Sequence, residues 1–330
     1  MIIARTPVRV SLLGGGTDYP DFFRKYGGQT LGLTINKYSY VTVSRLERFF
    51  DYNIRVSYSI TELVKTVDEI KHPSVRECLK FLNIEDGIEI NYVGDLPSRT
   101  GLGSSSSFTV TLLHALHAFK GEFVTREQLA EEAVYVEQEL IRERVGVQDQ
   151  YACAIGGLLH LSIEKSGKVL PGPIPLGRER MREFRSHLML FYTGLQRYAS
   201  EVLEEQIENI KRERINNKLK ILYELVSQGI EVLTNGNSIL DFGDLLNTAW
   251  EIKRTLSSKI TNPRIDEWYE RAKRAGAIGG KLLGAGGGGF LLLFVPPEKR
   301  TFVRNALSDL REVNFDFEYD GSRIIFYNPS

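Results

Sequence analysis

The stretch Gly101-Leu102-Gly103-Ser104-Ser105-Ser106-Ser107 joins a glycine turn to four consecutive hydroxyl side chains. Phe108–Phe119 follows at once as a nearly continuous apolar run without helix breakers, and Gly121 comes just after it, as is common at helix ends. Glycines let backbone amides approach an anion closely, and amides at a helix N-terminus carry partial positive charge. The sequence therefore predicts a phosphate-binding loop at the start of a buried helix. The alternative is a plain helix cap, with one serine capping and the others solvated.

Two further glycine-rich stretches are Gly14–Gly16 and Gly284–Gly289. The second matches the GxGxxG pattern, but the apolar run Phe290–Val295 follows it instead of preceding it, which is the wrong order for a dinucleotide-binding fold. The pattern GxxxxGK[ST] is absent, because Gly280-Lys281-Leu282 has no hydroxyl after the lysine. We expect Gly284–Gly289 to lie against a ligand or a neighbouring backbone. A simple turn between strands remains open.

One carboxylate, Glu137, has apolar neighbours on both sides along the expected helix. Its positions i±3 and i±4 are occupied by Ala133, Val134, Leu140 and Ile141. A glutamate on a buried stripe needs a cation or hydrogen-bond donors, and Mg²⁺ would serve. An edge position pointing to water is the alternative.

Asp149 and Arg9 are the other charged candidates. Asp149 starts a short expected helix, where it is either a general base aimed at a substrate hydroxyl or an acid favoured by the helix dipole. Arg9 lies near the end of the strand-like segment Ile2–Leu13, just before Gly14–Gly16. It is either a group that stabilises a transferring phosphoryl or a surface strand charge.

Composition narrows the class of protein. The 330 residues suit two domains, and 42 basic residues balance 42 acidic ones, so no charge excess points to nucleic acid or an anionic membrane. Two cysteines make no disulfide framework, and neither a signal peptide nor a membrane-spanning apolar run is present. We expect a cytoplasmic protein.

Strand and helix patterns alternate without a steady βαβ rhythm, so we predict an α+β fold. The expected strands are Ile2–Leu13, Leu33–Arg45, Ile54–Ser59, Ile88–Tyr92, His187–Thr193 and Phe290–Val295, with a terminal hairpin at Asp320-Gly321. The expected helices are Phe108–Phe119, one from Thr125 to about Arg144, Asp149–Ile155, a helical region over Gln196–Gly229, Ile239–Ser258 and Arg264–Ala275. A stretch rich in Pro, Gly and charge ends near Arg185, so we divide the chain into domains 1–185 and 186–330.

Three motifs in order resemble the GHMP kinases (galacto-, homoserine, mevalonate and phosphomevalonate kinases). They are the stretches Arg5–Tyr19, Pro97–Ser105 and Lys281–Gly289. Within that family, Gly14–Pro20, Thr34–Tyr38 and Ser104–Val110 look most like D-glycero-D-manno-heptose 7-phosphate kinases. Galactokinases carry Glu-His where this chain has Gly15-Gly16, which argues against galactose.

The resemblance implies a two-domain kinase, with an N-terminal α+β domain, a ferredoxin-like C-terminal domain and the active site between them. It implies that ATP phosphates lie on Gly101–Ser107, that Ser105 or a neighbouring serine and Glu137 hold Mg²⁺, that Asp149 is the base, and that Arg9 steadies the reacting centre. The implied sugar contacts are Gly15, Gly16, Thr17 and Asp18. The third motif, with Gly286, Gly287 and Gly288, would support the phosphate loop and the substrate side.

The implied reaction is phosphorylation of the anomeric hydroxyl of D-glycero-D-manno-heptose 7-phosphate to the 1,7-bisphosphate, on the route to nucleotide-activated heptose. The substrate's own phosphate needs a further cation, for which Lys37, Arg99 and Arg197 are candidates because they lie near motifs. The partners expected are a sugar phosphate and a second copy in a homodimer, without nucleic acid or membrane. A kinase for another sugar or sugar phosphate, and a non-catalytic nucleotide-binding regulator on the same fold, are the alternatives.

Overall fold

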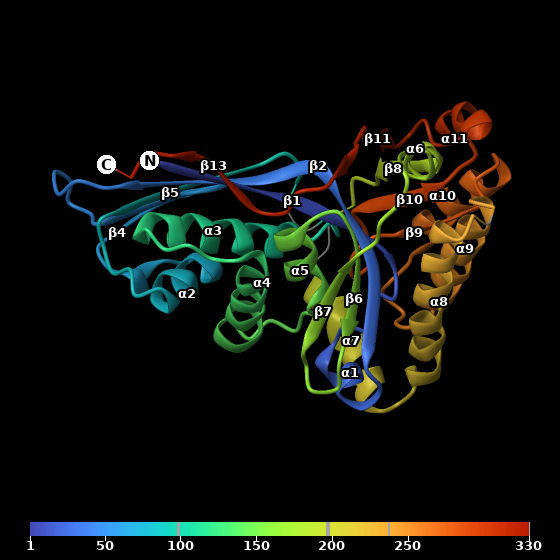
Figure 1. Ribbon diagram of the computed structural model, residues 1–330, viewed down its shortest axis with the longest axis horizontal. Helices are drawn as coiled ribbons and strands as arrows, with labels where there is room; N and C mark the ends of the chain where they lie inside the picture. The colour runs from blue at the N-terminus through green and yellow to red at the C-terminus, as the bar shows by residue number, and fades with distance from the viewer. Residues whose placement is uncertain (98–99, 196–198, 237, 330) are drawn as a thin grey trace.

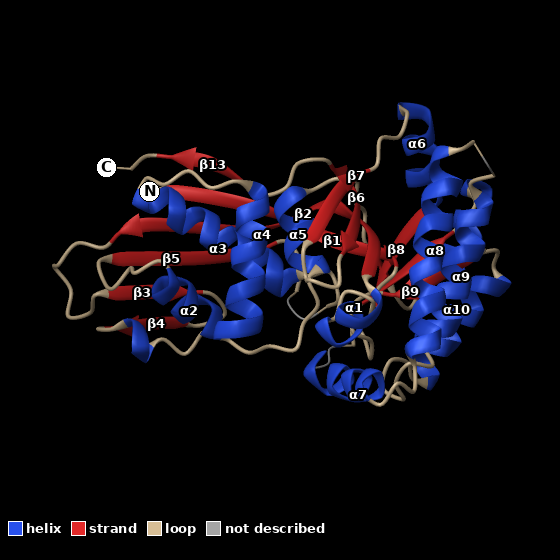
Figure 2. Cartoon of the chain, turned by 60° about the horizontal axis from the view of Figure 1, so that its bottom comes forward, coloured by secondary structure: helices blue, strands red, loops and turns tan. Residues whose placement is uncertain are grey.

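The computed structural model describes residues 1–97, 100–195, 199–236 and 238–329, with the side chains of 199–203 left aside. Two sheets and their covering helices make up the described chain (Figure 1). Seen with elements coloured by type, the large sheet and helices α2–α5 lie on one side, and helices α8–α10 lie with the small sheet on the other (Figure 2).

Within the described residues, nine strands form the large sheet. Its main path has the order β13-β1-β2-β5-β3-β4, while β12 and β6 pair with β2, and β7 pairs with β6. The strands are β1 (Ile2–Leu13), β2 (Gly28–Arg45), β3 (Ile54–Ser57), β4 (Thr61–Val64), β5 (Ile88–Gly94), β6 (Leu158–Ile163), β7 (Val169–Pro173), β12 (Phe317–Glu318) and β13 (Arg323–Tyr327).

The helices of this half agree only in part with the sequence patterns, which do not predict the first two. They are α1 (Pro20–Tyr26), α2 (Pro73–Phe81), α3 (Ser104–Lys120), α4 (Arg126–Tyr135) and α5 (Gln148–Ile155), with a 3₁₀ turn at Val67–Glu69 and a π-helical turn at Val136–Leu140. Helix α3 begins after Gly103 and ends at Gly121, both left-handed, as its apolar run between glycines predicts. Thr125 accepts a hydrogen bond from the amide of Gln128 and so caps α4.

The second half contains a smaller antiparallel sheet of order β11-β8-β10-β9. Its strands are β8 (Leu188–Tyr192), β9 (Gly279–Leu282), β10 (Phe290–Phe294) and β11 (Arg311–Glu312). Its helices are α6 (Arg178–His187), α7 (Ala199–Lys211), α8 (Asn216–Thr234), α9 (Leu240–Lys253), α10 (Pro263–Arg274) and α11 (Arg300–Ala306), with a 3₁₀ turn at Pro297–Lys299.

Strand β1 is long enough to reach both hydrophobic cores. Ala4 packs in the core under α2, α3 and α4, whereas Val8, Val10 and Leu12 pack in the core shared with the second half. The middle of β1 therefore lies at the seam between the two cores. Arg9, which is only 5% exposed, occupies that seam.

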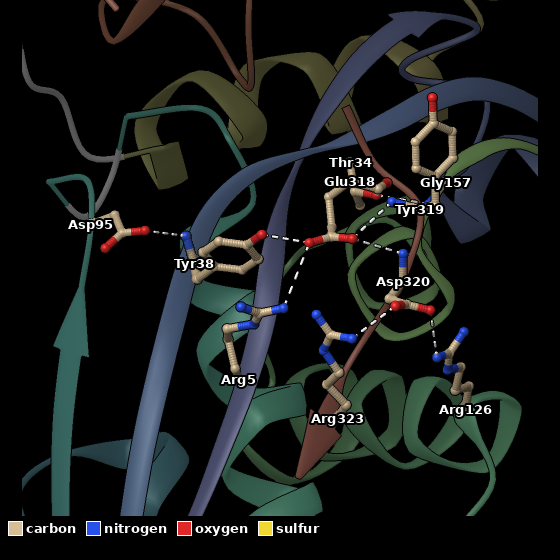
Figure 3. A network of polar contacts seen from close by, with 10 residues as sticks. All are labelled: Arg5, Thr34, Tyr38, Asp95, Arg126, Gly157, Glu318, Tyr319, Asp320 and Arg323. Carbon is tan, nitrogen blue, oxygen red and sulfur yellow. Dashed lines mark hydrogen bonds and ion pairs between the residues drawn. The ribbon is translucent and has the colours of Figure 1, made fainter. Parts of the chain in front are cut away.

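The C-terminal segment returns to the large sheet and is fixed there by charged side chains (Figure 3). Glu318 accepts hydrogen bonds from the hydroxyl of Tyr38 and from two backbone amides, and Arg5 lies 3.7 Å away. Asp320 pairs with Arg126 and with Arg323. The last strand thereby becomes an edge of the N-terminal sheet.

The α+β prediction is confirmed, but three local predictions are wrong. The expected hairpin at Asp320-Gly321 does not form, because β12 pairs with β2 and β13 pairs with β1. Position 321 has room only for glycine, because a Cβ there would lie 1.9 Å from the carbonyl oxygen of Ala154. The helix expected to reach Arg144 ends at Leu140, and the loop expected before residue 185 contains β7 and α6.

The division at 185/186 stays a proposal, with one correction. Residues 188–312 supply the small sheet, but Phe317–Tyr327 belongs to the sheet of the first domain. The domains are therefore not two uninterrupted stretches.

Candidate active site

Arg9 and Asp149 form a two-pronged ion pair between β1 and the first turn of α5. The Nε and Nη2 atoms of Arg9 donate to Oδ1 and Oδ2 of Asp149, each at 2.7 Å. Burial alone would lower the pKa of the Arg9 guanidinium, but the Asp149 carboxylate raises it above its ordinary value. The Asp149 side chain is 30% exposed, so it has an accessible side while the guanidinium holds it from behind.

The phosphate loop touches this pair directly. Nη1 of Arg9 donates to the carbonyl of Gly101 at 2.6 Å, and the Arg9 amide donates to the carbonyl of Leu102 at 3.0 Å. A Cβ on Gly103, whose φ is +69°, would lie 3.3 Å from Oδ2 of Asp149. The structure therefore brings the predicted loop, the predicted arginine and the predicted acid together.

Glycines of the third motif press backbone against the same loop. A Cβ on Gly284 would lie 2.3 Å from the Cα of Gly101, and one on Gly289 would lie 2.2 Å from the carbonyl oxygen of Thr100. Contact with the phosphate loop is thus made by the two ends of the motif. Its middle glycines, Gly286, Gly287 and Gly288, contact the backbone of Ile260 and Leu195 instead.

Glu137 is buried, as its apolar neighbours predict, with 1% of its surface exposed. Oε2 accepts hydrogen bonds from the Ser106 hydroxyl, at 2.8 Å, and from the Gln150 amide nitrogen. Oε1 has no hydrogen-bond partner in the described part of the chain. Burial raises the pKa of Glu137 to about 7, although neighbouring hydroxyls and the amide of Gln150 oppose the shift.

The loop serine next to Glu137 is Ser106. The resemblance implies that Ser105 or a neighbouring serine holds Mg²⁺ together with Glu137. The structure leaves Ser105 exposed and turns Ser106 toward the carboxylate. On the first turn of a helix, adjacent residues point about 100° apart, so only one of two neighbouring serines can face Glu137. Ser106 replaces Ser105 as the serine of a candidate metal site.

The oxygen atoms around Glu137 fit a magnesium ion. Oε1 of Glu137 and Oε1 of Gln150 are both buried without a hydrogen-bond partner, and the Ser106 hydroxyl is beside them. No cluster of three or more His, Cys, Asp or Glu occurs among the residues described. A site with the single carboxylate of Glu137 suits Mg²⁺, which proteins commonly hold with one or two carboxylates plus substrate phosphates.

The first glycine motif divides into structural and site-facing residues. The hydroxyl of Thr17 is fully buried and bonds to the backbone of Gly14 and Gln29, so the structure does not support the prediction that it holds a sugar hydroxyl. Asp18 accepts hydrogen bonds from the amides of Gly16 and Gln148. Burial and the Asp149 carboxylate raise the pKa of Asp18 above its ordinary value.

The other residues predicted to contact the substrate are two glycines, Gly15 and Gly16, and three basic residues. Gly15 is partly exposed, whereas a Cβ on the buried Gly16 would lie 3.0 Å from Nε2 of Gln206. Lys37 is partly exposed at the point where the register between β1 and β2 shifts. Arg99 and Arg197 lie outside the described residues.

Two lysines near the site were not singled out from the sequence. Lys253, the last residue of α9, donates to the carbonyls of Leu282 and Gly284, and Lys281 in β9 donates to the carbonyl of Leu12. In the sequence, Lys281 is notable only as part of the third motif, and Lys253 lies within an ordinary amphipathic helix. No pattern in the sequence marks either amine as buried.

Family models match both halves of the chain. GHMP kinases N terminal domain matches residues 63–157, and GHMP kinases C terminal matches residues 230–311, together more than half of the chain. The chain belongs to the GHMP kinase family. It is therefore a phosphotransferase, and as a kinase it uses ATP.

Individual relatives match over nearly the full length. The D-glycero-alpha-D-manno-heptose 7-phosphate kinase of Campylobacter jejuni is 27% identical over 96% of each chain. A putative sugar kinase from C. jejuni, of known structure, is 25% identical with a TM-score of 0.72, covering 98% of this chain and 97% of its own. A D-glycero-D-manno-heptose 1-phosphate kinase from Bacteroides thetaiotaomicron has a TM-score of 0.81 at 21% identity, covering 99% and 100%, and shows the fold.

Proposed function

We propose that this GHMP kinase transfers the terminal phosphoryl group of ATP to the anomeric hydroxyl of D-glycero-D-manno-heptose 7-phosphate, giving the 1,7-bisphosphate. The observation that carries the catalytic part is the contact of the Arg9–Asp149 pair with the phosphate loop at Gly101 and Gly103. The choice of sugar is supported by the full-length relative from C. jejuni and by the motif resemblance.

In the proposed reaction the anomeric oxygen forms a bond to the γ-phosphorus, and the bond from that phosphorus to the β,γ-bridging oxygen breaks. Asp149 accepts the hydroxyl proton, and ADP leaves. Each oxygen of Asp149 accepts one hydrogen bond from Arg9 and keeps a further lone pair for the substrate. Arg9 stabilises the charge that develops as the phosphoryl group moves.

Backbone amides and hydroxyls of Gly101–Ser107 would hold the β- and γ-phosphates at the start of α3. Glu137 and Ser106 would hold Mg²⁺, with Gln150 beside them. When bound, Mg²⁺ supplies positive charge that neutralises the phosphates.

Asp18 is the first-motif side chain that remains a candidate for sugar hydroxyls, since Thr17 is occupied by backbone. Lys37 is the described candidate for the substrate's own phosphate. A cytoplasmic location and a homodimer stay predictions of the sequence. Within the described residues, the helices are all too short or too polar to cross a bilayer.

A panel of sugars and sugar phosphates with ADP release as the readout tests the proposal. Heptose 7-phosphate should give the highest kcat/KM, and Asp149→Asn should slow that release by about two to four orders of magnitude while leaving ATP binding intact. Preference for a different sugar would correct the substrate only. ATP binding without turnover on any acceptor would favour a non-catalytic regulator and overturn the assignment.

A further inference from the structure

Two lysine amines bind backbone at the first and third glycine motifs. The amine of Lys281, in a side chain 3% exposed, donates to the carbonyl of Leu12, just before the glycines Gly14–Gly16 of the first motif. The amine of Lys253 donates to the carbonyls of Leu282, at 3.0 Å, and Gly284, at 2.6 Å, at the start of the third motif. Each lysine therefore binds backbone at the edge of a glycine loop.

The contacts continue from Lys253 to the catalytic pair without a gap. Gly284 packs on Gly101 so closely that a Cβ on Gly101 would lie 2.4 Å from the carbonyl oxygen of Leu283. The carbonyl of Gly101 accepts the hydrogen bond of Arg9, and Arg9 holds Asp149. A shift of the third motif would therefore move Gly101, and with it the partner of the guanidinium.

We propose that Lys253 and Lys281 are positioning residues for phosphoryl transfer, which fix the third and first glycine motifs so that the phosphate loop and the Arg9–Asp149 pair keep their spacing. The inference rests on the proposed phosphoryl transfer and not on the identity of the sugar.

The charge of the two lysine amines matters for this role, because a neutral donor could make the same hydrogen bonds at a smaller desolvation penalty. Burial and the nearby Arg9 lower the pKa of Lys253 to about 7, while Asp149 and Asp18 oppose that shift. Burial, Lys253 and Arg9 lower the pKa of Lys281, and Asp18 opposes. Arg9 and the two lysines thus share this region with two carboxylates, and an anionic phosphate chain at the loop would favour the charged form of the amines.

Lys253→Met tests the proposal, with Lys273→Met as the matched control. Lys273 is a partly buried lysine of α10 whose amine donates to the carbonyl of Ile278, away from the glycine motifs. Turnover is measured on any acceptor that the wild type uses, or as ATP hydrolysis by water if no sugar is used. Failure of the heptose assignment therefore leaves this test intact.

Lys253→Met should lower kcat about a hundredfold, because a displacement of about 1 Å costs that much, and should change the KM for the acceptor far less. Lys281→Met should act in the same direction. Lys253→Arg, which keeps a charged donor, should recover at least about tenfold over Lys253→Met. Lys273→Met should retain wild-type kcat.

Thermal unfolding separates this role from a loss of folding. A folded Lys253→Met with kcat within about threefold of wild type would overturn the proposal, as would equal losses in Lys253→Met and Lys273→Met. If Lys253→Met does not fold, the proposal is tested instead by the kcat of Lys253→Arg and by the midpoint of its pH–kcat profile. A folded Lys253→Arg variant without detectable turnover would overturn the proposal. A near-wild-type kcat, with the alkaline fall of the pH–kcat profile moved to higher pH, would support it.

Discussion

The carboxylate of Asp149 receives two parallel hydrogen bonds from the guanidinium of Arg9, each 2.7 Å long. The two residues are 140 positions apart in the chain, and Arg9 also bonds to the carbonyl of Gly101. In the reaction proposed above, Arg9 would thereby set the distance between the proton acceptor and the triphosphate. The site depends on this three-way arrangement.

Asp149→Asn should lower kcat by about two to four orders of magnitude, because the amide cannot accept the hydroxyl proton. ATP affinity, measured by calorimetry, should stay within a few-fold of wild type. Asp309→Asn is the matched control, since Asp309 is also paired with an arginine, Arg271, in the second half of the chain. Near-normal turnover of Asp149→Asn would remove it as the base.

Arg9→Lys should lower kcat roughly a hundredfold, because an ammonium cannot keep both parallel bonds to Asp149 and the bond to Gly101. Steady-state kinetics with saturating ATP measures the effect. A lysine variant with wild-type kcat would show that point charge alone suffices and that the fork geometry is unimportant.

Glu137→Gln should change how stability depends on pH in the absence of metal. The pKa of Glu137 is raised by burial from 4.5 to about 7, so the folded state favours the protonated acid. Stability of the wild type should therefore fall by about 3 kcal/mol as pH rises from about 4.5 to 7, and level off above that. Denaturant midpoints from pH 4.5 to 8 should show this loss in wild type and its absence in Glu137→Gln.

Magnesium separates the metal role of Glu137 from a purely structural one. Added Mg²⁺ with a non-hydrolysable ATP analogue should stabilise the wild type at pH 8 and should stabilise Glu137→Gln much less. The same metal-dependent stabilisation in both proteins would exclude Glu137 as a ligand.

Thr17→Val should destabilise the protein by about 1–3 kcal/mol, because the buried amide of Gln29 would lose its hydroxyl acceptor. The KM for the sugar should not change, since the Thr17 hydroxyl is occupied by backbone. A selective rise in that KM with unchanged stability would return Thr17 to the substrate site.

Local patterns predicted the parts of the site that depend on helix periodicity and glycine geometry. The four apolar neighbours of Glu137 correctly indicated its burial, because side chains at i±3 and i±4 share a helix face. The apolar run after the four serines correctly indicated a buried helix that begins at Ser104, and Gly284–Gly289 lies against neighbouring backbone, as one of its interpretations predicted.

What the sequence could not supply were contacts between distant segments. Nothing local shows that β13 pairs with β1 instead of β12, because the paired residues, such as Ile2 and Tyr327, lie at opposite ends of the chain. Lys253 was missed for the same reason, since its carbonyl partners lie about thirty residues further on. The backbone bonds of the Thr17 hydroxyl were missed as well, because its partner Gln29 belongs to the next strand.

A crystal structure with a non-hydrolysable ATP analogue and Mg²⁺ tests the central claim most directly. The account predicts β- and γ-phosphates bound by amides and hydroxyls of residues 101–107, Mg²⁺ bound by Glu137, and the γ-phosphorus facing Asp149. A triphosphate bound away from that loop, or separated from Asp149 by intervening chain, would contradict it.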